Sequence, residues 1–174
     1  MQAVIVYESI YGNTRQVAEA VAEGCRRARP DAAVQCVPAA EAGPELTASA
    51  DLLVVGGPTH MRGMSSGLSR RMAVAAAGKS AKDEDPHPAE DVGVGLRTWF
   101  HSLPRTDTGH RAAAFDTRGD ARGSGGAAKG IAHRLSHLHY ELAAEPTGFI
   151  VEDGEGPLRE GELERARQWG AALV

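Results

Sequence analysis

The chain has 174 residues, of which 42% are hydrophobic and 24% charged, and this composition predicts one globular domain with a substantial core over residues 1–174. Its net charge of −4 excludes the basic surplus that non-specific nucleic-acid binding needs, so we expect no nucleic-acid partner. No apolar run is long enough for a membrane span, and two cysteines make a disulfide scaffold implausible, so we expect a cytoplasmic protein without a membrane span.

Strand-like and helical patterns alternate from the first residues onward. Residues 2–7 form an apolar, β-branched run that predicts a strand, and apolar residues at three- and four-residue spacing predict a helix over 13–28. A short strand is predicted at 33–37. Residues 51–57 are almost continuously apolar, which is typical of a strand buried on both faces. A further helix is predicted from the spacing of Leu68, Met72, Ala75 and Ala76.

The alternation continues after a charged, proline-containing stretch. Residues 78–92 have no periodicity and predict a surface excursion. The later elements predicted are a short helix at 96–103, a strand at 112–115, a helix at 128–138, a strand at 148–151 and a helix at 163–173. Five strands interleaved with helices predict a three-layer α/β fold, in which helices cover both faces of a parallel sheet.

The turn between the first strand and the first helix has the composition of a phosphate site. Unpaired backbone N–H groups at a helix N-terminus carry the positive end of the helix dipole. Ser9 and Thr14 add hydroxyl donors, Asn13 adds an amide, and Gly12 permits a close backbone approach. The turn contains no lysine or arginine, so it would hold a phosphate mainly with neutral dipoles. The alternative is an ordinary helix start with Asn13 or Thr14 as its N-cap.

This turn resembles the phosphate loop of the flavodoxin family, which follows the first strand and reads Ser/Thr-x-x-Gly-x-Thr. The resemblance implies the flavodoxin-like fold, a five-stranded parallel sheet in the order 2-1-3-4-5 with a ligand crevice at the carboxyl ends of its strands. It also implies FMN as a non-covalent cofactor. The residues expected to hold its phosphate are Ser9, Ile10, Tyr11, Gly12, Asn13 and Thr14.

Two further loops are expected at the same edge of the sheet. The pattern Gly-Pro-Thr-x-x-x-Gly-Met-Ser after the third strand resembles the isoalloxazine-binding loop of flavodoxin-like proteins, including the NAD(P)H:quinone oxidoreductases of that fold. By this likeness, one edge and face of the flavin would be lined by Pro58, Thr59, His60, Met61, Arg62 and Gly63. The loop after the fourth strand would offer backbone groups to the pyrimidine side of the ring, from Asp116, Thr117, Arg118 and Gly119.

The side chains of these two loops differ from those of an electron carrier. Carrier flavodoxins commonly stack aromatic side chains on the ring, and neither loop contains Trp, Tyr or Phe. Arg62 and Arg118 would stabilise the negative charge that accumulates on the ring during two-electron reduction; the alternative is that both are solvated. His60 is the candidate catalytic residue, as a proton relay to a quinone, and its alternative role is to position the loop.

Three functions therefore remain open. The first is an electron carrier that docks on a redox partner protein. The second is a reductase that takes hydride from NAD(P)H and passes it to a quinone-like or flavin acceptor. The third is a flavodoxin fold that has lost FMN and acts as a binding module. The aromatic-poor loops favour the second and third, the phosphate turn favours the first two, and an oligomer remains possible.

Other chemical motifs carry less weight. The pattern Gly63-Met64-Ser65-Ser66-Gly67 matches a hydrolase nucleophile elbow, but a loop separates it from the strand that such an elbow must follow. His133 and His137 have a spacing that suits a metal, yet they lie on the polar stripe of their helix. We therefore predict no metal site.

Overall fold

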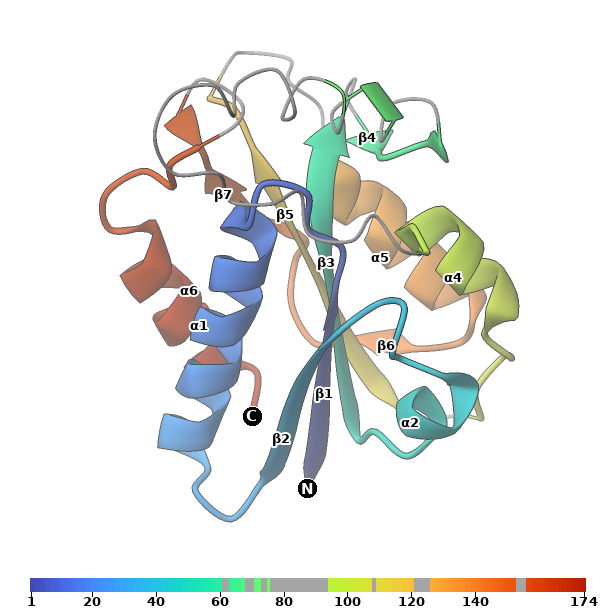
Figure 1. Ribbon diagram of the computed structural model, residues 1–174. Coiled ribbons are helices and arrows are strands. Elements are labelled where there is room, and N and C mark those ends of the chain that lie inside the picture. Colours follow the sequence, from blue (N-terminus) through green and yellow to red (C-terminus); the bar gives the residue numbers. More distant parts are fainter. Residues whose placement is uncertain are drawn as a thin grey trace.

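A β-sheet with helices on both faces organises the computed structural model (Figure 1), which describes residues 1–60, 63–67, 71–72, 75, 94–107, 109–120, 126–152 and 156–174. The strands are β1 (Gln2–Tyr7), β2 (Ala33–Pro38), β3 (Leu52–His60), β4 (Gly63–Met64), β5 (Arg111–Arg118), β6 (Glu141–Leu142) and β7 (Thr147–Ile150). The helices are α1 (Asn13–Ala28), α2 (Pro44–Ala48), α4 (Leu96–Ser102), α5 (Ala127–His137) and α6 (Glu162–Ala172).

The sheet confirms the predicted order of strands. Its path runs β2-β1-β3-β5-β6, and all of these neighbours are parallel. Two short strands fill the place of the predicted fifth strand, because β6 pairs with the start of β5 and β7 pairs with its end. Pro146 lies between them and has no N–H to donate, which interrupts the ladder there. The short β4 pairs antiparallel with the end of β3.

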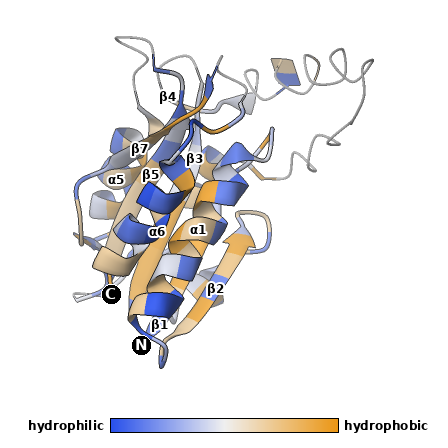
Figure 2. Cartoon of the chain, turned by 90° about the vertical axis from the view of Figure 1, so that its left-hand side faces the viewer, coloured by the Kyte–Doolittle hydropathy of each residue, from blue (hydrophilic) through white to orange (hydrophobic). Residues whose placement is uncertain are grey.

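Two hydrophobic clusters lie on opposite faces of the sheet. Because side chains alternate along a strand, Ile5 and Val54 face the cluster under α1 and α6, whereas Val4 and Val55 face the cluster under α4 and α5. Hydrophilic and hydrophobic bands alternate along α1 in Figure 2, as expected for a helix with one face on the sheet. This arrangement leaves the carboxyl ends of β1, β3 and β5 together at one edge.

The helices α1 and α6 pack unusually closely against each other. A Cβ atom on Gly24 would lie 2.0 Å from the carbonyl oxygen of Arg167, and one on Gly170 would lie 2.3 Å from that of Val21. The thiol of Cys25 donates a hydrogen bond to the Gly170 carbonyl at 3.3 Å. The absence of a side chain at both glycines is therefore a requirement of the contact.

Most predicted element boundaries agree with the structure. The first helix has its predicted bounds, while the third and fourth strands extend further, to His60 and Arg118. The short α2 was not predicted, although Pro44 occupies a favourable position at its start. Most of the helix predicted from Leu68 to Ala76, and all of the excursion at 78–92, lie outside the described residues. None of the described helices is long and apolar enough to cross a membrane.

Candidate functional site

The turn from β1 into α1 presents main-chain amides at the sheet edge. Gly12 adopts the left-handed conformation at φ 83°, and its carbonyl accepts a hydrogen bond from the Gln16 amide at 3.0 Å. The Ser9 hydroxyl accepts from the Arg15 amide at 3.4 Å. The Gly12 and Thr14 amides donate to no acceptor in the part of the chain that the structure describes. Two N–H groups at the positive end of α1 are thus available to an anion.

The helix start is not the ordinary N-cap that was the alternative for this turn. Gly12, rather than Asn13 or Thr14, is the N-cap residue, and it makes no side-chain cap hydrogen bond. Ile10 is buried and anchors the turn, whereas Tyr11 is partly exposed.

A hydroxyl pair connects this turn to the end of β5. The Oγ1 atoms of Thr14 and Thr117 lie 2.7 Å apart, and the two residues are only 2% and 5% exposed. Because one hydroxyl donates to the other, the accepting hydroxyl keeps its own proton for a further acceptor. Two residues predicted for the site from separate loops, 103 positions apart, are therefore in direct contact.

Asn13 contacts a loop that the sequence analysis did not include. Its buried side chain lies against Gly156, where a Cβ atom would be 2.6 Å from the Asn13 Nδ2. Gly156 has φ 120°, a conformation that favours glycine. Arg159 pairs with Asp120 and with Glu152, each at 2.8 Å, so the chain after β7 is also fastened to the loop after β5. The Gly156-Pro157 turn signal was the available clue.

The loop after β3 is held at both ends. Thr59 accepts a hydrogen bond at its Oγ1 from the Ala127 amide at 2.9 Å, which fixes the end of β3 to the start of α5. His60 is the last residue of β3 and pairs in register with Gly63. Met61 and Arg62 lie outside the described residues, as does the His60 side chain. The roles of His60 and Arg62 stay predictions.

Glu8 is a structural residue of the site that the sequence analysis missed. It is 8% exposed, and its carboxylate accepts hydrogen bonds from the Leu96 amide at 2.9 Å and from the Ser65 hydroxyl. Its own amide donates to the Gly56 carbonyl at 3.0 Å. Glu8 therefore joins three segments: the phosphate turn, the loop after β3 and the first turn of α4. An acid directly after a buried strand was the sequence signal for it.

The carboxyl of Asp116 is fully buried beneath this edge. Its Oδ2 accepts from the Ala128 amide at 2.9 Å, whereas Oδ1 has no hydrogen-bond partner among the described residues. The Nε of Arg118 lies 3.6 Å from Oδ1. Burial raises the pKa of Asp116, and the Ala128 amide and the Arg118 charge oppose that rise only in part.

The strand pairing limits which main-chain groups at the end of β5 are available to a ligand. Asp116 and Thr117 lie within β5 and pair in register with both β3 and β7. The guanidinium of Arg118 lies over Gly148, where a Cβ atom would be 2.3 Å from Nη2. Gly119 is the first of the four predicted residues to lie beyond the strand, so its main-chain groups are outside the β5 pairing.

Replacing Asp116 with asparagine is expected to change how stability depends on pH. A carboxyl whose folded pKa lies above its ordinary 3.8 stabilises the fold when protonated, and that contribution is lost as the pH rises through the raised value. Wild-type stability minus that of Asp116→Asn should therefore fall as pH increases, and then level off. Urea unfolding of both proteins at a series of pH values measures this difference. A difference that increases with pH would contradict the assignment.

Comparisons with known proteins agree with this architecture. The family model for Flavodoxin matches residues 5–169. The structure of a flavodoxin from the domain Archaea is 21% identical, with TM-score 0.66, over 99% of this chain and 96% of that one. Oxidised Flavodoxin 1 from Bacillus cereus is 17% identical, with TM-score 0.66, over 100% of this chain and 97% of that one. A flavodoxin, WrbA-like protein from Agrobacterium tumefaciens is 23% identical, with TM-score 0.58, over 99% of this chain and 94% of that one. At the level of sequence, no curated protein matches the chain significantly.

Proposed function

The chain belongs to the flavodoxin family, whose members bind FMN and transfer electrons, and from this premise we propose that it holds FMN between the loops after β1, β3 and β5 and passes electrons to a redox partner protein. FMN supplies the redox chemistry when bound. The protein's own residues would bind the phosphate and hold the edge of the ring.

The turn at residues 9–14 is the observation that carries this proposal. It offers the Gly12 and Thr14 amides, the Ser9 hydroxyl and one hydroxyl proton of the Thr14–Thr117 pair, all at the positive end of α1. A Cβ atom placed on Gly12 would meet no described atom within 4 Å, so space for a ligand remains above the turn. Neutral donors at a helix start suit a phosphate dianion, and the residues present fit the phosphate of FMN.

Loss of the Ser9 hydroxyl is expected to weaken FMN binding about ten-fold, since a hydrogen bond to a charged group contributes about 1.5–3 kcal/mol. The measurement is a titration of the purified protein with FMN, followed by flavin fluorescence and absorbance. Wild type should saturate at one FMN per chain, and Ser9→Ala should bind more weakly. Ser136→Ala is the matched control, because Ser136 is exposed on α5, away from the turn. No saturable binding by wild type would favour the third function, a fold that has lost FMN.

A reductase is the second candidate, and a property of the loops favours it. Residues 57–67 and 116–126 contain no Trp, Tyr or Phe to stack on the ring, which would leave one face open to a substrate. In this case NAD(P)H would be the donor, a quinone-like compound the acceptor, and His60 a proton relay. Oxidation of NADH or NADPH in the presence of a soluble quinone, by FMN-loaded protein alone, distinguishes a reductase from a carrier. Whether the protein is a carrier or a reductase, the proposal places it in the cytoplasm, where the free thiols Cys25 and Cys36 would stay reduced.

A further inference from the structure

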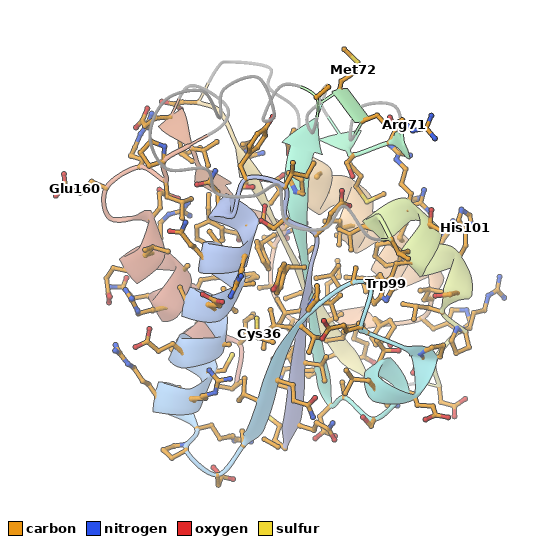
Figure 3. The ribbon with its side chains drawn as sticks, viewed as in Figure 1. Cys36, Arg71, Met72, Trp99, His101 and Glu160 are labelled. Atoms are coloured by element: carbon orange, nitrogen blue, oxygen red, sulfur yellow. The ribbon has the colours of Figure 1, made fainter. Side chains whose placement is uncertain are left out.

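Basic residues form two parallel stripes on one side of the molecule. On α4 and the residues after it, Arg97, His101 and Arg105 follow one another at four-residue spacing. On α5 the same spacing connects Lys129, His133 and His137. All six residues are exposed, and we call them the basic face. Figure 3 shows His101 on the outer side of α4, whereas the buried Trp99 points toward the sheet.

The two stripes lie on the same side of the sheet, because α4 and α5 cover the same hydrophobic cluster. The helices α4 and α5 lie side by side in Figure 1, and the guanidinium of Arg134 on α5 lies over the ring of Phe100 on α4, 5.9 Å from its centroid. The rings of His133 and His137 are 4.5 Å apart. Neither helix contains an Asp or Glu. The described residues of the two helices therefore contribute basic side chains and no acidic ones.

The charge of the basic face is not neutralised within the described part of the chain. None of its arginine or lysine residues forms an ion pair there, and the acids of adjacent segments, Glu41, Glu45, Asp107 and Glu141, make no ion pair with it. The opposite side of the sheet differs. There, Arg15 pairs with Glu19, and Arg167 pairs with Glu23, so the α1–α6 surface carries both signs. The protein is acidic overall, and the six residues of the basic face are exposed on one side of the sheet.

The basic face begins at the proposed FMN site. The Arg97 guanidinium donates to the Met64 and Ser65 carbonyls, each at 3.0 Å, which attaches α4 to the loop after β3. The start of α5 is attached to Thr59, at the end of β3. A protein bound on the basic face would therefore lie against the loop after β3, which we propose frames the flavin ring. Electron transfer requires the redox centre of the partner to be close to that ring.

We propose that the basic face is the docking surface for an acidic redox partner protein, whose carboxylates surround its own redox centre. This inference rests on the proposed electron-transfer function and adds the charge of the partner to it. Complementary charge mainly increases the association rate and orients the encounter. A nucleic acid is a poorer fit, because the net charge of the chain is −4 and only three of the six residues are arginine or lysine.

Binding of an acidic [2Fe–2S] ferredoxin, used as the probe, tests the proposal. Its dissociation constant is measured by thermophoresis on the full chain, with and without FMN. We expect the double variant Arg105→Glu/Lys129→Glu to weaken binding about ten-fold at low salt, and much less at about 150 mM salt. The matched control, Arg26→Glu/Arg29→Glu, makes the same change in net charge on the α1 side and should alter binding less than about two-fold. Circular dichroism melting confirms that both variants fold.

Three results would overturn the proposal. Equal weakening by both double variants would mean that only net charge matters. Tighter binding of a basic cytochrome c, or of a 20-nucleotide single-stranded DNA, would assign the surface to another kind of partner. Unchanged ferredoxin binding by Arg105→Glu/Lys129→Glu at low salt would mean that these residues do not contact the partner. Docking is measured without FMN as well, so a failed FMN titration and a failed docking test remain distinguishable.

Discussion

Replacing Gly170 with alanine is expected to lower the free energy of unfolding by about 3 kcal/mol, because overpacking against rigid neighbours costs that much. The new methyl group would lie 2.3 Å from the Val21 carbonyl oxygen and 2.9 Å from two further backbone atoms of Val21. Backbone atoms of a packed helix cannot move aside singly, so α6 must shift away from α1. The shift would also lengthen the hydrogen bond from the Cys25 thiol. Thermal melting should show a Tm lower by roughly 6–12 °C.

Gly130 provides the matched control for this substitution. It lies in the interior of α5, and among the described residues a Cβ atom there would meet the Met64 side chain alone, at 3.8 Å. Gly130→Ala should therefore raise stability by up to about 1 kcal/mol, the ordinary gain in helix propensity. Gly24→Ala should resemble Gly170→Ala, and the double variant should cost less than the sum, because the helices separate only once. A Gly170→Ala protein as stable as Gly130→Ala would mean that the close contact between α1 and α6 is wrong.

Replacing Thr14 with valine is expected to weaken FMN binding by about 10- to 100-fold, since it removes a hydroxyl that we assign to the phosphate. It should also reduce stability, because the Thr117 hydroxyl, 5% exposed, would lose its partner. Thr14→Ser keeps the hydroxyl and should retain most of both properties. FMN titration and urea unfolding measure the two effects separately.

The double variant Thr14→Val/Thr117→Val separates binding from folding. Removal of both hydroxyls leaves no buried partner unpaired, so stability should recover toward wild type. Affinity for FMN should remain low, because no hydroxyl at this point faces the phosphate. If Thr14→Val bound FMN as tightly as wild type, or if affinity recovered together with stability, the turn at residues 9–14 would not be the phosphate site.

The site illustrates which parts of such a protein can be predicted from sequence. The turn at residues 9–14 could be predicted as a phosphate site because its signal is local: an apolar strand, a short turn with hydroxyl, glycine and amide residues, and a helical repeat follow one another directly. The left-handed conformation at Gly12 agrees with this expectation. By contrast, Glu8 was missed, because its role depends on Leu96, 88 residues away, and on Ser65. The same holds for Gly156, whose importance comes from the Asn13 side chain.

The sequence by itself determined the α/β class, the order of elements and the positions of most strands and helices. These follow from periodicity and turn chemistry, which act between residues close together in the chain. Only the tertiary structure decided that Thr14 meets Thr117, that the Asp116 carboxyl is buried at the start of α5, and that two basic stripes share one face. These depend on strand register and on helix placement over the sheet. Both are set by packing between segments far apart in the chain, which no local pattern specifies.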